Sequence, residues 1–341
     1  MVGDQVSSQP AKDEPSHRNS GSSAPVNTVS QKKIPMTNAS NTSSDASCST
    51  CPSRKKSGHG ERSAVGNVQD QLIKSTLDNI RFKLFVMSGK GGVGKSSIAV
   101  NLAAALALKG HRVGLLDVDI HGPSVPHLLG LSGPLEQSRG SLISPKRYGE
   151  RLFVVSMESL LQDPDQAVLW RGPMKTAAIR QFIADVDWGH LDYLVVDSPP
   201  GTGDEPMTVL KTIPEALSIV VTTPQEISLA DVRKAINFLQ YAHANILGLV
   251  ENMSGLICPH CSERIELFKT GGGETLAKKY GLEFLGAIPL DPAAVVAGDL
   301  GKPVVMLDED TPAKRALLQL AETVIRTSEN SLEAAAGGPP Q

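Results

Sequence analysis

Aromatic residues are scarce in this 341-residue chain. Phe, Trp and Tyr make up 4% of it, and none occurs before Phe82. No run approaches the ~18 uninterrupted apolar residues of a membrane-spanning helix. The formal net charge of −3 provides no basic field over the whole chain, which argues against bulk nucleic-acid binding. The sequence therefore predicts a protein that neither crosses a membrane nor binds nucleic acid in bulk.

Export signals and a disulfide framework are also missing. The amino terminus, MVGDQVSSQPAKDEP, has no apolar signal core, and its early acidic residues are atypical of a transit peptide. The four cysteines form two Cys-x-x-Cys pairs, Cys48/Cys51 and Cys258/Cys261. Without a secretion signal, such pairs are typical of metal ligands or of a redox pair in a reducing compartment. We therefore expect a cytoplasmic protein.

The composition divides the chain. Residues 1 to about 70 contain 15 serines and many Asn, Gly and Pro residues. Such a segment buries too little apolar area to offset its ordering entropy, so we predict that it is disordered. The tail 329–341 has a similar composition, so we predict that it is disordered as well. A single α/β domain is expected over 72–328.

Short apolar runs alternate with helical periods in this domain. The expected strands are 83–88, 112–117, 152–156, 193–197, 217–222, 246–252 and 284–288. The expected helices are 95–109, 175–184, 206–212, 228–242 and 273–280. The alternation predicts a doubly wound, mostly parallel sheet. Ligands of such sheets bind at the carboxyl ends of the strands.

A glycine-rich loop, SGKGGVGKSS, follows the first expected strand and opens a helix. It fits the G-x-x-x-x-G-K-[ST] phosphate-binding pattern from Gly89 to Ser96. In this pattern Lys95 neutralises the β- and γ-phosphates, and the Ser96 hydroxyl binds Mg²⁺. A ligand-free glycine turn does not account for the placement between strand and helix. The predicted nucleotide-binding residues are Gly89, Lys90, Gly91, Gly92, Val93, Gly94, Lys95, Ser96 and Ser97.

The second lysine of this loop adds to the prediction. The string GKGGVGKSS resembles the deviant Walker A loop of the ATPase class that includes MinD, ParA and the nitrogenase iron protein. The resemblance implies that Lys90 reaches across a dimer interface to the nucleotide of the partner. It therefore implies an ATP-linked homodimer in which Lys90 and Lys95 are catalytic.

Two expected strands end in carboxylates. One ends in LLDVDIHGPS, with Asp117 and Asp119, and the other in VVDSPPGTGD, with Asp197 after four apolar residues. This second pattern is typical of a Walker B strand, whose Asp holds Mg²⁺. We predict Asp117 and Asp197 on the Mg²⁺ side. The resemblance assigns orientation of the attacking water to Asp119.

The pair Cys258/Cys261 supplies two thiolates, whereas a tetrahedral sulfur site needs four. Two copies of the chain related by a two-fold axis would supply four. Three interpretations remain open on the residues alone: a [4Fe–4S] cluster shared by two copies, a zinc ion held in the same way, and a redox pair of the thioredoxin type.

Three strings carry a closer resemblance. DVDIHGPS, SPPGTGDEP and ENMSGLICPHC together are similar to the Mrp/ApbC-type iron–sulfur cluster carriers, over about residues 80–325. The resemblance implies that Cys258 and Cys261 hold a [4Fe–4S] cluster between two copies, that ATP is hydrolysed slowly, and that the cluster passes to apo iron–sulfur proteins. In the wider class, Asn252 and Pro289 correspond to adenine contacts.

Alternatives remain for the function of the protein and for the role of its first cysteine pair. A positioning ATPase of the MinD/ParA type is the main rival. A further helical segment near the carboxyl end, AKRALLQLAETVIRTSEN, has mixed charge rather than the basic amphipathic character of a membrane anchor, which argues against this rival. The pair Cys48/Cys51 departs from the four-cysteine motif that some eukaryotic relatives carry near the amino terminus. Three interpretations remain open for this pair: a degenerate or dimer-shared second site, a flexible thiol pair that helps to deliver a cluster, and no role in a disordered tail.

Overall fold

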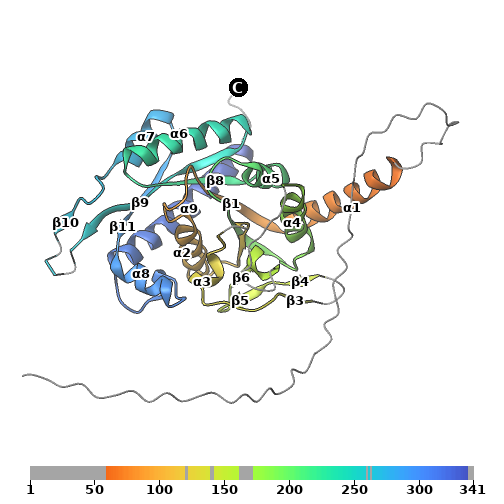
Figure 1. The fold of residues 1–341 in the computed structure, drawn as a ribbon, viewed down its shortest axis with the longest axis horizontal. Helices are drawn as coiled ribbons and strands as arrows, with labels where there is room; N and C mark the ends of the chain where they lie inside the picture. Colours follow the sequence, from red (N-terminus) through yellow and green to blue (C-terminus); the bar gives the residue numbers. More distant parts are fainter. Residues whose placement is uncertain are drawn as a thin grey trace, which may run out of the picture. The chain divides into compact units, whose positions relative to one another are not determined.

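A computed structural model describes residues 59–119, 122–138, 142–160, 172–258, 260–261 and 263–336 (Figure 1). The pair Cys48/Cys51 lies outside the described residues. The strands are β1 Ile80–Ser88, β2 Val113–Asp117, β3 Glu136–Gln137, β4 Ile143–Ser144, β5 Lys146–Tyr148, β6 Leu152–Ser156, β7 Leu191–Asp197, β8 Leu217–Thr222, β9 Asn245–Ile257, β10 Arg264–Ile265 and β11 Phe284–Leu290. The α-helices are α1 His59–Asp78, α2 Lys95–Leu108, α3 Val125–Leu128, α4 Gly172–Asp185, α5 Asp204–Thr212, α6 Glu226–Tyr241, α7 Gly272–Tyr280, α8 Pro292–Asp299 and α9 Pro312–Ala336.

Most of the strands belong to one sheet, in the order β10-β9-β8-β1-β7-β2-β6-β5, with β11 also paired to β9. The pairs from β9 to β6, and that of β11 with β9, are parallel, whereas β10 and β5 run antiparallel to their neighbours. The chain leaves β1 toward β2 on one side and returns later to β8 on the other. Ligands of open α/β sheets bind at such a reversal of strand order.

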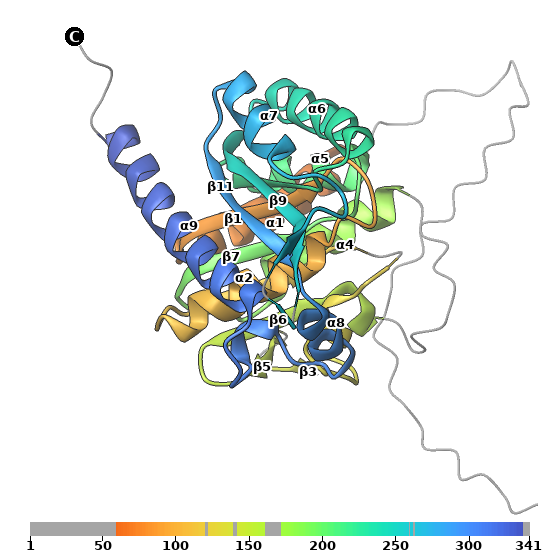
Figure 2. The same ribbon diagram turned by 90° about the vertical axis from the view of Figure 1, so that its left-hand side faces the viewer.

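The side chains of β1 show how the sheet is covered. Phe82, Leu84 and Val86 pack with α2 and α9, whereas the alternate residues Phe85 and Met87 pack with α4, α6 and α7. Side chains of a strand alternate between the two faces of a sheet, so β1 is buried on both faces. Figure 2 shows α2 and α9 on one side of the strands and α6 and α7 on the other.

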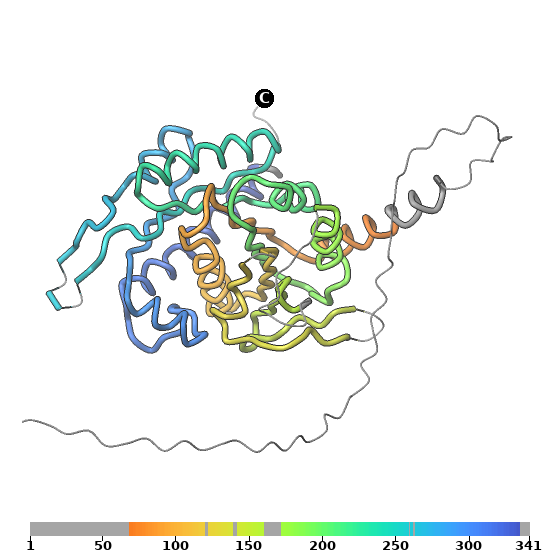
Figure 3. The backbone as a smooth tube through the Cα atoms, in the orientation of Figure 1, coloured from red at the N-terminus to blue at the C-terminus, as the bar shows by residue number. Residues whose placement is uncertain are grey.

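The predicted doubly wound, mostly parallel fold is confirmed. Each of the seven expected strands and each of the five expected helices has a counterpart within a few residues of its predicted bounds. The main difference is in β9, which continues past the expected end at Asn252 to Ile257 and pairs there with β10. β9 therefore extends from the core of the sheet to the cysteines and forms the first strand of a hairpin. This hairpin projects from the edge of the sheet in Figures 1 and 3.

Two helices extend into the segments that were expected to be disordered. The segment 1–70 was expected to be disordered throughout, but helix α1 begins at His59, and its residues Ile73 and Leu77 are buried against the sheet. The tail 329–341 was expected to be disordered from its start, but α9 continues to Ala336. The residues 331–336, SLEAAA, are mostly good helix formers, and the first glycine follows at 337. Among the described residues, no helix combines the length and the apolar character needed to cross a membrane.

Candidate nucleotide site and cysteine hairpin

The loop 89–94 between β1 and α2 depends on glycine at three positions. Gly92 and Gly94 have φ of 78° and 79°, in the left-handed region that glycine adopts without strain. A Cβ on Gly89 would lie 2.3 Å from the carbonyl oxygen of Asp231 in α6. A Cβ on Gly94 would lie 2.2 Å from Nδ2 of Asn252. The backbone can therefore curl at this strand end only with glycine at these places.

The curled loop borders a cleft of about 330 Å³ at the carboxyl end of β1. Loop residues 90–97 form one wall of the cleft. The other lining residues are Ser88, Asp119, Gly122, Ser124, Leu128 and Pro200. The cleft thus brings the predicted phosphate loop together with Asp119, at the place where the strand order reverses. Backbone amides and the start of α2 at this position suit an anionic phosphate group.

Lys95 and Asp197 form a buried ion pair beside this loop. The ammonium group of Lys95 donates to Oδ1 of Asp197 and lies 3.1 Å from Oγ of Ser96. The other carboxylate oxygen of Asp197, Oδ2, is buried and has no hydrogen-bond partner among the described residues. Burial raises the pKa of Asp197, and the charge of Lys95 opposes this effect. An anionic oxygen without a partner next to a serine hydroxyl fits the oxygen-rich site that Mg²⁺ prefers.

Asp117 occupies the position next to Asp197 on the adjacent strand, because the two residues are paired between β2 and β7. Oδ1 of Asp117 accepts the backbone N–H of Asp119 at 3.0 Å, and Oδ2 accepts the hydroxyl of Ser156 at 3.0 Å. Burial, and then the charge of Asp197, raise the pKa of Asp117 well above its ordinary value. Ser156 was not predicted, because nothing in the sequence indicates that the end of β6 meets the end of β2.

Asp119 follows β2 and lines the cleft. Its Oδ1 accepts the N–H of Gly122 at 3.1 Å, and the residue is only 8% exposed. Lys90 also lines the cleft, and its carbonyl oxygen accepts the hydroxyl of Ser88 at 2.8 Å. The carbonyl oxygen of Ser88 in turn accepts the N–H of Gly201 at 2.9 Å. This bond attaches the glycine-rich segment after β7 to the end of β1, beside the phosphate loop.

The two predicted adenine contacts lie next to each other on β9 and β11. Asn252 is paired with Ile288, the residue before Pro289. Nδ2 of Asn252 donates to the carbonyl oxygen of Val93 at 2.9 Å. Asn252 therefore contacts the phosphate loop, although neither Asn252 nor Pro289 is among the residues that line the cleft.

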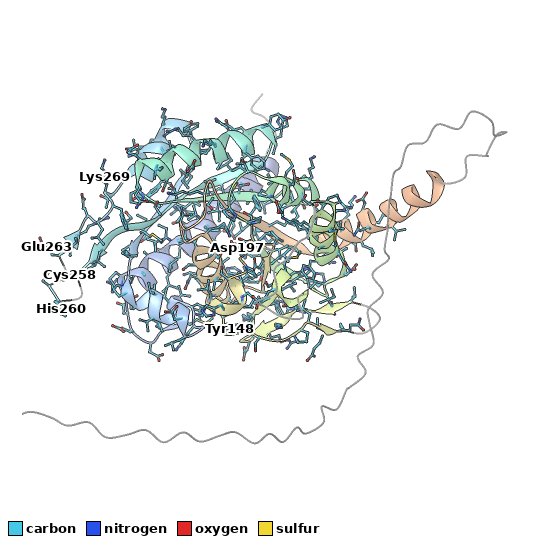
Figure 4. The ribbon with its side chains drawn as sticks, viewed as in Figure 1. Tyr148, Asp197, Cys258, His260, Glu263 and Lys269 are labelled. Atoms are coloured by element: carbon cyan, nitrogen blue, oxygen red, sulfur yellow. The ribbon has the colours of Figure 1, made fainter. Side chains whose placement is uncertain are left out.

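The cysteines lie away from this cleft, beyond the end of β9. The N–H of Cys258 donates to the carbonyl oxygen of Glu263 at 2.9 Å, which closes the hairpin with β10. Cys258 is half-buried and Cys261 is exposed, and both are free thiols. The backbone N–H of Cys261, and then that of His260, lower the pKa of the Cys258 thiol. Figure 4 shows Cys258, His260 and Glu263 at the tip of the hairpin, far from Asp197.

The hairpin offers two thiolates and little else for a metal. Across the described residues, no group of three or more His, Cys, Asp and Glu side chains is placed to hold a metal ion. A four-coordinate sulfur site therefore needs ligands from outside this part of the chain.

Known proteins resemble this chain over the whole α/β domain. Residues 79–325 match the sequence profile of a family described as NUBPL iron-transfer P-loop NTPase. A protein of Methanocaldococcus jannaschii named iron–sulfur cluster carrier protein is 46% identical over 265 residues, which cover 77% of this chain and 91% of the relative. A protein of the same name from Saccharolobus solfataricus is 42% identical over 263 residues, which cover 77% and 89%.

Solved structures agree with this relationship. A nucleotide-binding protein of Archaeoglobus fulgidus, in complex with ADP and with cobalt, has a TM-score of 0.62 at 39% identity and covers 72% of this chain and 98% of its own. The cell division ATPase MinD of Pyrococcus furiosus shares the fold, with a TM-score of 0.51 at 21% identity and coverage of 72% and 98%. The expected resemblance to the deviant Walker A class and to the cluster carriers is confirmed. The chain belongs to the NUBPL iron-transfer family of P-loop NTPases.

Proposed function

We propose that this protein is an ATP-hydrolysing carrier that binds a [4Fe–4S] cluster and transfers it to apo iron–sulfur proteins in the cytoplasm. The observation that carries the proposal is the pair of free thiols at the tip of the hairpin, a half-buried Cys258 and an exposed Cys261. The first strand of this hairpin contacts the phosphate loop. The names of the relatives, iron–sulfur cluster carrier protein, support the same cargo. The cluster is cargo in this proposal, since it must arrive and leave.

The nucleotide part of the proposal uses the residues around the cleft. Lys95 and the loop amides bind the phosphates of ATP, and Asn252 and Pro289 contact the adenine. Ser96, Asp197 and Asp117 would hold Mg²⁺, which neutralises charge on the phosphate oxygens during transfer. Asp119 orients the attacking water. The unpartnered Oδ2 of Asp197 supports the metal assignment.

The dimer part of the proposal follows from the thiolate count. One hairpin supplies two thiolates, so two copies of this chain would hold one cluster between them. In such a homodimer Lys90 of each copy reaches the nucleotide of the other, so hydrolysis requires the dimer. We also propose that this hydrolysis is slow. The partners are therefore a second copy of the chain and the apo-proteins that receive the cluster.

Anaerobic reconstitution with iron and sulfide tests the cargo. We expect about four irons per dimer, a visible iron–sulfur absorption spectrum, and loss of both in Cys258→Ser and Cys261→Ser. The double variant Cys48→Ser/Cys51→Ser is the matched control and should keep the iron held by the hairpin. A full cluster retained in the Cys258→Ser/Cys261→Ser double variant contradicts the proposal. Zinc bound without iron supports a zinc-bridged dimer instead.

Transfer is tested separately with the loaded dimer. An apo [4Fe–4S] enzyme is mixed with it, and the recovered enzyme activity is followed with and without MgATP. We expect recovery to require the loaded dimer, and to be faster than with the same amount of free iron and sulfide in the presence of a chelator. Recovery that the chelator abolishes would mean release into solution rather than carriage.

A further inference from the structure

β9 changes its backbone geometry between the phosphate loop and the cysteines. Met253 has φ of 58° and Gly255 has φ of 74°, so two positions inside this strand are left-handed. The pairing with β11 shifts register at the same place, between Ile288 and Leu290. A left-handed residue other than glycine costs about 1–2 kcal/mol, so contacts around it must hold this geometry. We refer to residues 252–255 as the β9 kink.

The upstream end of the β9 kink contacts the phosphate loop directly. Asn252 donates from Nδ2 to the carbonyl oxygen of Val93 at 2.9 Å. A Cβ on Gly94 would lie 3.8 Å from Cε of Met253, so that side chain also packs against the loop. A change in the loop backbone when phosphates bind therefore acts on the first two residues of the kink.

The downstream end is bound by one side chain of the hairpin. Nη2 of Arg264 donates to the carbonyl oxygen of Ser254 at 3.1 Å and lies 3.5 Å from its Oγ. The guanidinium group crosses Gly255 closely, since a Cβ at Gly255 would lie 2.9 Å from Nε of Arg264. The left-handed glycine thus leaves the space in which Arg264 reaches the kink.

Arg264 is itself close to the cysteines. It pairs with Ile257 across the hairpin, and its neighbour Glu263 accepts the N–H of Cys258 at 2.9 Å. Arg264 is therefore connected to both strands of the hairpin, and its neighbour Glu263 is hydrogen-bonded to Cys258.

Glu251 fixes the inner side of the kink. Its fully buried carboxylate accepts the hydroxyl of Ser254 at 2.6 Å and the N–H groups of Gly271 and Gly273 at 2.9 and 2.6 Å, at the start of α7. Charge-assisted bonds of this kind are about twice as strong as neutral ones. Ser254 is thus held between the sheet core, through Glu251, and the hairpin, through Arg264.

We infer that Arg264 is a positioning residue that couples the phosphate loop to the cysteine hairpin, so that nucleotide binding changes the hold on the cluster. The cluster part rests on the proposed function, whereas the coupling of nucleotide to hairpin is a property of the cluster-free chain as well. Coupling between two binding sites is reciprocal, so the cluster must change the nucleotide affinity by the same factor as the nucleotide changes the cluster affinity.

Hydrogen exchange of the full-length, cluster-free protein with and without MgADP tests the coupling. In the wild type we expect MgADP to change the exchange of amides in 256–268 by ~5-fold or more. Arg264→Gln should bring this ratio to about 1, whereas Arg264→Lys, which keeps a cationic donor for the Ser254 carbonyl, should restore part of it. Lys269→Gln is the matched control, since it removes a positive charge from an exposed residue of the connection between β10 and α7, close to Arg264 in the sequence.

The second measurement is the MgADP affinity of the cluster-loaded and cluster-free wild type and of Arg264→Gln. The two wild-type values should differ by ~5-fold or more, and the two Arg264→Gln values should agree. The unfolding midpoint of each variant shows whether it is folded. A wild type without a hairpin response, or an Arg264→Gln protein that responds like the wild type, overturns the inference. A chain that responds in hydrogen exchange but never holds a cluster leaves the coupling intact and refutes the proposed function instead.

Discussion

Asp117 and Asp197 stand in paired positions at the carboxyl ends of β2 and β7, and both residues are fully buried. Among the ion pairs of the described residues, one ammonium group, that of Lys95, reaches this region, and it bonds to Asp197. Two adjacent carboxylates with one cation are an unfavourable arrangement in a nucleotide-free protein. The arrangement becomes favourable when a divalent cation binds.

Asp117→Asn should stabilise the protein in the absence of Mg²⁺ and nucleotide. The folded state raises the pKa of Asp117, so the folded chain binds this proton more tightly than the unfolded chain does. Asp117 therefore reduces stability increasingly as the pH rises above its unfolded value of about 3.9. At pH 7 the variant should gain ~1 kcal/mol or more in the free energy of unfolding, measured by urea denaturation. The gain should shrink as the pH falls toward this unfolded value and vanish below it, where Asp117 of the wild type is protonated in both states. A variant less stable than the wild type at pH 7 contradicts this expectation.

Lys95→Ala and Lys90→Ala should have different effects. Removing Lys95 takes away the phosphate ligand and leaves Asp197 without its cation, so ATP binding should be lost and stability should fall by ~3–5 kcal/mol. Lys90 lines the cleft and has no such buried partner in the ion pairs of the described residues. Lys90→Ala should bind ATP but lose hydrolysis that depends on the dimer. Calorimetry measures binding, and phosphate release measures turnover. If both variants bind and hydrolyse ATP normally, the role of Lys90 across the dimer is wrong.

Asp119→Asn should separate binding from hydrolysis. The carboxylate lines the cleft and is held by the N–H of Gly122, a bond that Asn can also accept. Loss of a group that positions or activates the attacking water typically lowers the rate by ~100-fold or more. We therefore expect ATP affinity within about twofold of the wild type and phosphate release reduced by at least that factor. Glu274→Gln, an exposed residue of α7 paired with Lys278, is the control. Equal turnover in Asp119→Asn and the control would exclude the assigned role.

Asn252→Ala should weaken ATP binding without unfolding the protein. The substitution removes the 2.9 Å bond to the carbonyl oxygen of Val93 and any contact with the base. Loss of one hydrogen bond to the nucleotide corresponds to a ~10-fold lower affinity. Asn245→Ala, at the exposed start of the same strand, should bind ATP like the wild type. Titration calorimetry measures the ATP affinity of the two variants. Equal affinities would show that Asn252 is not part of the nucleotide site.

Much of this architecture could be predicted from local sequence. The glycine spacing of 89–94 requires a particular backbone path, and Asp117 and Asp197 each end an apolar run, so a parallel sheet must bring them to the same edge. The order of the strands was not needed for that conclusion. The site residues that depend only on strand ends and on the phosphate loop were therefore accessible from one sequence.

The residues that were missed depend on contacts between distant segments. Ser156 reaches Asp117 only because β6 lies beside β2. Arg264 reaches Ser254 only because β9 continues past its expected end and the chain then returns beside it as β10. The left-handed Met253 has no sequence signal, since glycine or asparagine is the usual residue at such a position. Helix α1 was missed for a similar reason, because its polar sequence hides the few side chains, such as Ile73, that pack on the sheet.

The central place of β1 in the sheet has a consequence for synthesis of the protein. Lys95 and its ion-pair partner Asp197 are 102 residues apart, and Asn252 is 159 residues from Val93. β1 itself must wait for β7 and β8 before either of its edges is paired. A ribosome-bound chain that has just exposed its phosphate loop is therefore unable to form the site, and this high contact order favours slow, late folding. The nucleotide site becomes complete only when β9, the strand that leads to the cysteines, has emerged. A truncated chain that ends before β9 should therefore neither hydrolyse ATP nor carry a cluster.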